Sequence, residues 1–154
     1  MTIGYIKYNY MSQYLQFYLK QKESDTQLCI GYFCTTPARQ IADTGAFPYI
    51  ENNTPLTEEQ MEHCITILKN EAQDCVNHLK EYTQCRLEMQ ENLYKCVSKE
   101  VAEIFLEKID DYDSAIKEYT EEIEDWNWRI NKITNILEIY EDNKDKWDLF
   151  YINC

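Results

Sequence analysis

Cysteine and histidine are the residues of this 154-residue chain that first suggest chemistry. Four cysteines recur at spacings of 11, 10 and 11 residues: Cys64, Cys75, Cys85 and Cys96. Eleven residues of helix span about 16 Å, whereas the ligands of one zinc ion lie roughly 3–4 Å apart because each bond is ~2.0–2.3 Å long. Only His78 lies one helical turn from a cysteine, Cys75. We therefore expect no metal site and no cofactor, and interpret these cysteines as small buried apolar residues.

Other catalytic patterns are also missing. Neither histidine has a glutamate three residues before it, as a di-iron bundle would require. The three glycines are too far apart to form a phosphate-binding loop, and no serine lies in a Gly-x-Ser-x-Gly setting. We predict that the protein is not an enzyme and has no catalytic residues. A reactive thiol at Cys29 or Cys34 remains the enzymatic alternative, because a histidine distant in sequence can still approach in space.

Aromatic side chains crowd into the first fifty residues. Tyrosine combines a flat apolar face with a hydroxyl group and suits recognition of a peptide or a nucleobase. Arginine can bind a phosphate or carboxylate with two parallel hydrogen bonds. The candidate residues for a small anionic aromatic ligand, such as a nucleotide, are Tyr5, Tyr8, Tyr32, Arg39 and Tyr49. The structural alternative is that these tyrosines cover the helices that follow.

The net charge of −13 is unevenly distributed. Residues 1–56 are neutral overall, whereas residues 103–125 hold ten acidic side chains against two lysines. Such a field repels nucleic acid and anionic membranes and attracts basic surfaces. The simplest interpretation is a solvated helix face, and the more specific one is a binding surface for a basic protein. The candidate partner-binding residues are Asp110, Asp111, Asp113, Glu118, Glu121 and Glu122.

Two apolar stripes at helical spacing dominate the remainder of the chain. The first stripe, interrupted by Arg86, comprises Met61, Ile65, Leu68, Ala72, Cys75, Leu79, Tyr82, Met89, Leu93 and Cys96. The second stripe comprises Ile109, Tyr112, Ile116, Tyr119, Ile123, Trp126, Ile130, Ile133, Leu137 and Tyr140. Alternating steps of three and four place each stripe on one helix face. No glycine or proline follows Pro55, and Thr57 with Gln60 forms a capping box at the helix start.

The two stripes are out of phase, and apolar residues between them shift to Val97, Val101, Ile104 and Phe105. Residues 110–114, Asp-Asp-Tyr-Asp-Ser, favour a turn and a helix cap. We therefore predict an antiparallel helical hairpin, or coiled coil, over residues 57–154 with its turn near 110–114. The alternative is one continuous rod of about 140 Å.

Residues 1–56 predict a small Tyr-rich α+β head. We expect a strand over residues 2–10, a short helix over 11–19 capped by Ser12, and a buried strand over 27–34. A short helix should start at Thr36-Pro37 and end at Gly45. The predicted fold class is therefore mainly α (α+β), with a small mixed N-terminal head followed by a long helical hairpin.

These features predict a non-enzymatic interaction protein that self-associates through its helical stripes. Tyrosines and tryptophans exceed what one hairpin can cover, so we expect a homodimer, for example a four-helix bundle of two hairpins. The first 22 residues lack the apolar core of a secretory signal, and no stretch is long enough to span a membrane. We expect an intracellular, cytoplasmic protein with reduced thiols and no direct nucleic-acid or membrane binding. The amino-acid usage is typical of an AT-rich genome, which would suit a viral or phage inhibitor of a host protein. The alternative function is a module that sequesters a nucleotide-like ligand.

Overall fold

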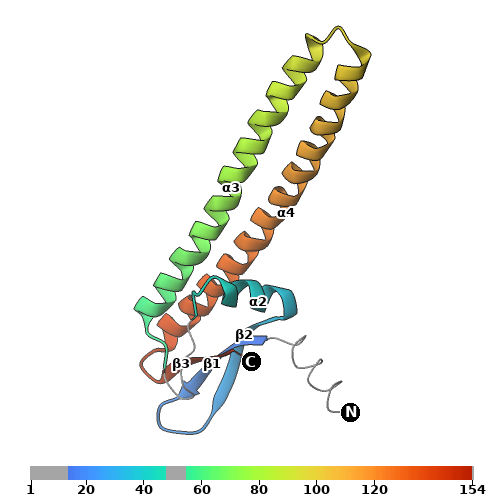
Figure 1. The fold of residues 1–154 in the computed structure, drawn as a ribbon. Coiled ribbons are helices and arrows are strands. Elements are labelled where there is room, and N and C mark those ends of the chain that lie inside the picture. The colour runs from blue at the N-terminus through green and yellow to red at the C-terminus, as the bar shows by residue number, and fades with distance from the viewer. Residues whose placement is uncertain (1–13, 48–54, 154) are drawn as a thin grey trace, which may run out of the picture. The chain divides into compact units, whose positions relative to one another are not determined.

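The computed structural model describes residues 14–47 and 55–153 and consists of one three-stranded sheet, one short helix and two long helices (Figure 1). In chain order the elements are β1 (Tyr14–Gln21), β2 (Gln27–Cys34), α2 (Thr35–Asp43), α3 (Glu58–Tyr94), α4 (Lys99–Asn143) and β3 (Trp147–Asn153). The predicted fold class, a mainly helical chain with a mixed head and a helical hairpin, is confirmed.

The central strand β1 is a correction to the sequence prediction, which placed a helix over residues 11–19. Leu15, Phe17 and Leu19 are buried in alternation, which is the two-residue period of a strand. The helical interpretation left Phe17 out of its stripe, although this ring is fully buried against Phe47 and Tyr151. Antiparallel neighbours on both sides, β2 and β3, determine the strand. The strand expected over residues 2–10 lies outside the described residues.

Strand β2 and helix α2 lie close to their predicted positions. The expected strand over residues 27–34 is confirmed and pairs with β1, but the prediction that this strand is buried is wrong, because Phe33 is its one buried residue and the others are exposed or half-buried. The helix starts at Thr35, one residue before the predicted cap, and the predicted stop at Gly45 is confirmed. Gly45 has φ +73°, and its amide donates to the carbonyl oxygen of Ala42. This left-handed conformation is one that glycine adopts without a steric penalty.

The C-terminal strand β3 is a second correction, because residues 57–154 were predicted to be hairpin throughout. β3 pairs with β1 from Leu15 to Gln21, with Leu19 opposite Leu149. Leu149 is fully buried and also bridges Leu56. The head therefore contains sequence from both ends of the chain, and the predicted domain boundary at residue 56 is wrong for the sheet.

The two long helices form the predicted antiparallel hairpin. Every residue of both apolar stripes is buried or half-buried. The capping box at the start of α3 is present, with the Gln60 amide donating to Thr57 Oγ1 at 3.1 Å and the Thr57 amide donating to Gln60 Oε1 at 2.9 Å. The periodicity of the sequence was therefore sufficient to locate the buried faces of the hairpin.

The turn of the hairpin lies at residues 95–98, so the prediction of a turn near 110–114 is wrong. Residues 110–114 lie inside α4, where Tyr112 continues the second stripe and the three aspartates are exposed. Aspartate costs a helix less than ~1 kcal/mol, which burial of the flanking stripe residues outweighs. The arms measure about 55 Å and about 67 Å for 37 and 45 residues.

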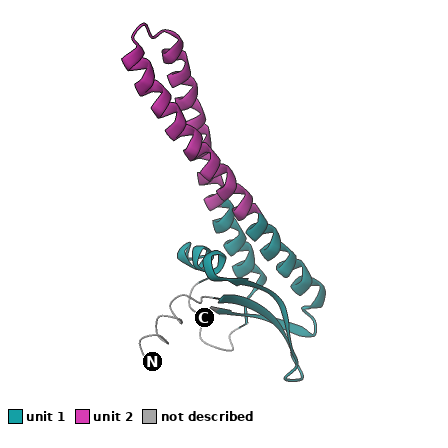
Figure 2. Cartoon of the chain, turned by 90° about the vertical axis from the view of Figure 1, so that its right-hand side faces the viewer, with its two compact units in different colours: residues 1–69, 128–154 teal, residues 70–127 magenta. Residues whose placement is uncertain are grey.

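The chain divides into two compact units, coloured separately in Figure 2. Unit 1 comprises residues 1–69 and 128–154 and holds the sheet, α2 and the adjoining ends of the long helices. Unit 2 comprises residues 70–127, which include the turn of the hairpin. The candidate surfaces below each belong to one unit.

Candidate functional site

Unit 2 holds most of the charge of the molecule. Its 16 carboxylates and six basic side chains give it a net charge of −10 out of −13. Asp110, Asp111, Glu118 and Glu121 are exposed on α4. Because these carboxylates lie in water on a rigid helix, they produce a persistent negative field around the hairpin.

The other two predicted partner-binding residues contact α3. Asp113 forms an ion pair with Arg86, the one residue that interrupts the first stripe. Glu122 accepts a hydrogen bond of 3.4 Å from the Cys75 thiol. Asp113 and Glu122 therefore help to join the two helices, and only four of the six predicted carboxylates are left for an outside partner.

Aromatic rings fill the middle of the hairpin in unit 2. The ring of Tyr119 stacks on His78 with centroids 5.2 Å apart and on Tyr82 with centroids 5.6 Å apart. Burial, together with the nearby Tyr82, raises the pKa of Tyr119. These residues remain half-buried or exposed in the single chain, so one hairpin does not fully cover its own stripes.

The turn end of the hairpin is apolar and exposed. The large apolar side chains exposed there are Leu87, Tyr94, Val97, Val101, Ile104 and Leu106. A hollow of about 490 Å³ opens beside Val97, Val101 and Phe105. Residues 94–108 carry three lysines and three glutamates and are neutral overall. An exposed apolar patch of this kind is typical of a protein interaction surface.

The predicted nucleotide-binding residues are only partly described. Tyr5, Tyr8 and Tyr49 lie outside the described residues. Tyr32 lies on β2 and Arg39 on α2, and both are exposed. The structure therefore brings no nucleotide site together within the described part of the chain, and nucleotide binding stays a prediction.

Tyr32 instead takes part in a cluster in unit 1 that the sequence did not reveal. The Nζ atom of Lys132 lies over three aromatic rings, 4.7 Å from the centroid of Phe33, 4.9 Å from Trp128 and 5.3 Å from Tyr32. Nζ also donates a hydrogen bond to the carbonyl oxygen of Tyr32. Rings within ~6 Å of a cation attract it through their negative faces.

Close contact between β2 and α4 builds this cluster. A Cβ atom at Gly31 would lie 2.7 Å from Cδ1 of Ile136, so glycine at this position permits the contact. Lys132 and Trp128 precede Ile136 by one and two helical turns and share its face. A register shift in β2 next to Gly31 leaves Ile30 without a partner on β1. The sequence signal was a Trp-x-x-x-Lys-x-x-x-Ile pattern, which is uninformative until β2 is placed beside it.

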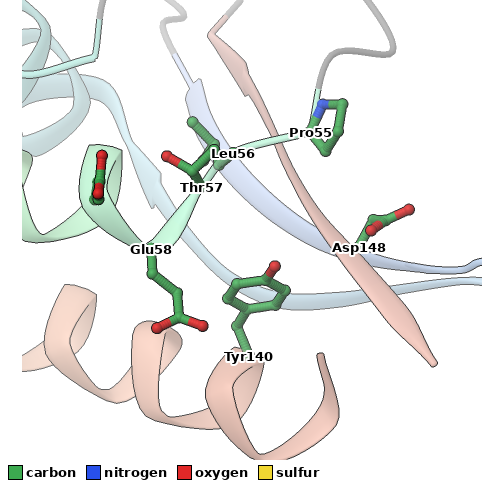
Figure 3. Close-up of a pocket in the computed structure, with 7 residues that line it drawn as sticks. Pro55, Leu56, Thr57, Glu58, Tyr140 and Asp148 are labelled. Carbon is green, nitrogen blue, oxygen red and sulfur yellow. The ribbon is translucent and has the colours of Figure 1, made fainter. Parts of the chain in front are cut away.

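A second hollow in unit 1, of about 530 Å³, lies where α3 begins (Figure 3). Glu58, Tyr140 and Asp148 line it. Glu58 pairs with Lys144 at 2.9 Å, and Asp148 pairs with Lys22 at 3.8 Å. Burial, then the charges of Asp148 and Glu58, raise the pKa of Tyr140. Lysines of the same chain therefore pair with two of the three carboxylates that line the hollow, and Glu59 is the third.

The thiols differ strongly in accessibility. Cys29 and Cys34 on β2 are exposed. The buried Cys64 thiol donates to the carbonyl oxygen of Ala46 at 2.6 Å, and burial raises the pKa of Cys64 to about 12. Burial and Glu122 raise the pKa of Cys75 to about 11. Cys64 and Cys75 are therefore protonated and unreactive at neutral pH.

Residues 14–47 and 55–153 contain neither a metal-binding cluster nor a membrane-spanning helix. No group of three or more His, Cys, Asp or Glu side chains there could hold a metal ion. No helix there is both long enough and apolar enough to cross a bilayer.

Comparison with known proteins identifies no similar protein. No protein-family model, no curated protein and no solved structure matches this chain.

Proposed function

We propose that this chain is a non-enzymatic interaction protein that binds a basic partner through its acidic hairpin and self-associates through the apolar surface of that hairpin. The net charge of −10 on unit 2, with Asp110, Asp111, Glu118 and Glu121 exposed on one helix, is the observation that carries the proposal. Complementary charge accelerates encounter and selects among partners. If the partner uses its basic surface to bind nucleic acid, the acidic hairpin bound there would block that binding and inhibit the partner.

Charge reversal tests the partner-binding surface. Replacement of Asp110, Asp111, Glu118 and Glu121 by lysine should abolish capture of basic proteins from a cell lysate, identified by mass spectrometry, because the field that attracts them is removed. The matched control replaces four exposed carboxylates of unit 1 by lysine, which changes the net charge equally: Glu138, Glu141, Asp142 and Asp145. Circular dichroism should show unchanged helix content in both variants.

The control decides between a defined surface and overall acidity. Retained capture by the control and lost capture by the hairpin variant would support the proposal. Equal loss in both variants would mean that net charge alone drives binding. Unchanged capture by the hairpin variant would contradict partner binding through these four carboxylates.

Self-association rests on the apolar surface that one hairpin leaves open. Val97, Val101 and Ile104 are exposed at its neutral turn end, where two copies can meet without bringing their acidic stretches together. Sedimentation of the wild-type protein should show a mass that rises with concentration from 18.5 kDa toward twice that value. The Val101→Glu/Ile104→Glu double variant should remain monomeric, because two buried unpaired carboxylates are costly.

The control for this measurement adds the same charge elsewhere on α4. Ser114 and Thr120 are exposed, so Ser114→Glu/Thr120→Glu should associate like the wild type. A wild-type protein that stays at 18.5 kDa over the whole concentration range would contradict self-association. A dimer that persists in the Val101→Glu/Ile104→Glu variant would exclude the turn end as the contact.

A further inference from the structure

We propose that Tyr32, Phe33 and Trp128 form an aromatic cage that binds a methylated ammonium group, and that Lys132 occupies this cage as an internal competitor. The ligand class is a quaternary or highly methylated ammonium ion, carried either by a methylated lysine side chain of a polypeptide or by a small molecule of the choline type. This site lies in unit 1, and it does not depend on the acidic hairpin of unit 2.

The geometry of the three rings is that of a binding site for a cation. Each centroid lies within 5.3 Å of the Lys132 ammonium. The rings of Phe33 and Trp128 meet at 89° with centroids 5.7 Å apart, so they form two perpendicular walls. Phe33 is buried, whereas Tyr32 and Trp128 are 53% and 52% exposed. The cage therefore has a buried inner wall and an outer side that is open to solvent.

The chemistry of the cage suits a methylated ammonium better than the primary ammonium it holds. A primary ammonium carries three N–H donors. Among the described residues, Lys132 Nζ has one hydrogen-bond acceptor, the Tyr32 carbonyl, and no carboxylate partner. Aromatic faces attract positive charge but accept hydrogen bonds poorly. A trimethylammonium group has the same charge, no N–H donors to satisfy and methyl groups that pack against rings.

Lys132 occupies the cage because it is tethered to it by the same chain. A tethered group competes at a high effective concentration, so it weakens the apparent affinity of a free ligand even when that ligand fits the rings better. Lys132 lies on α4, and its side chain reaches the rings from one turn before Ile136, which packs against Gly31. Its removal therefore leaves the contact between β2 and α4 in place. We expect the intact protein to bind weakly and the variant without this side chain to bind well.

The test uses isothermal titration of the full chain with tetramethylammonium, choline, and a short peptide carrying trimethyllysine or unmodified lysine. Lys132→Ala should bind the quaternary ions at least tenfold more tightly than the wild type. Lys132→Ala/Trp128→Ala should lose this binding, because one wall of the cage is gone. Lys144→Ala, which removes a lysine that directly follows α4 and is paired with Glu58, should bind like the wild type.

The titrations distinguish the two sources of the ligand and test whether the cage binds a cation. Preference of Lys132→Ala for the trimethyllysine peptide over the unmodified peptide supports a polypeptide ligand, and binding of choline alone supports a small-molecule ligand. Equal binding by Lys132→Ala and Lys132→Ala/Trp128→Ala, or no gain over the wild type, overturns the proposal. Circular dichroism checks the fold of each variant, and Lys132→Ser, which also empties the cage, serves as a second unmasking variant. Upfield shifts of the ligand methyl protons in Lys132→Ala, caused by the aromatic ring currents, would place the ligand within the cage.

Discussion

The Phe17→Ala variant should lose about 3–5 kcal/mol of stability, the cost typical of deleting a buried phenylalanine ring. Phe17 is fully buried at the centre of β1, with its ring edge-on to Phe47 at 5.4 Å and tilted against Tyr151 at 6.4 Å. Removal of the ring leaves a cavity beside Phe47 and Tyr151. Since domains of this size have a total stability of ~5–15 kcal/mol, the variant should approach the limit of folding.

Denaturant unfolding followed by circular dichroism measures this loss. The midpoint should fall while the slope stays constant, which identifies a change in stability rather than in the denatured state. Lys20→Ala on the same strand, where the side chain is only half-buried, should change stability by less than ~0.5 kcal/mol. A loss below ~1 kcal/mol for Phe17→Ala would contradict the placement of this ring in the core.

The Leu149→Ala variant should lose about 2–5 kcal/mol, as for other fully buried leucines. Leu149 lies opposite Leu19 in the sheet and bridges Leu56 just before α3. Its backbone therefore joins the C-terminal strand to the central strand and to the residue before the hairpin, and its side chain is buried in the core. Urea unfolding should show the lower midpoint, and native-state hydrogen exchange should be faster for the amides of β1 and β3.

The matched control is Ile152→Ala on the same strand. Ile152 is 42% exposed, so its truncation should cost no more than ~1 kcal/mol. Equal losses at the two positions would show that Leu149 does not face the core. They would contradict the packing of residues 147–153 as a strand of the sheet.

The acidic hairpin was the part of the candidate site that the sequence could predict. A run of carboxylates on a helix must be exposed unless each is paired, because burial of a charge is costly. That argument correctly located Asp110, Asp111, Glu118 and Glu121 on an outer face. It could not anticipate that Asp113 and Glu122 contact Arg86 and Cys75, because those contacts depend on how the two helices are aligned.

The sequence by itself determined the local features whose energies depend on neighbours along the chain. Three such features are present: both apolar stripes, the Thr57 capping box and the Gly45 helix stop. Each depends on residues that are only a few positions apart in the sequence. The local sequence indicated the wrong position for the hairpin turn. Asp-rich residues 110–114 favour a turn only weakly, and burial of both stripes along the paired helices overrode them.

Only the tertiary structure decided features that join distant parts of the chain. β1 is a strand because β2 and β3 pair with it, and the second of these partners comes from the C-terminus. The cage around Lys132 requires Tyr32 and Trp128, which lie almost a hundred residues apart in sequence. Sheet pairing and ring–cation contacts depend on spatial proximity, and periodicity along one segment carries no information about which distant segment will be its neighbour.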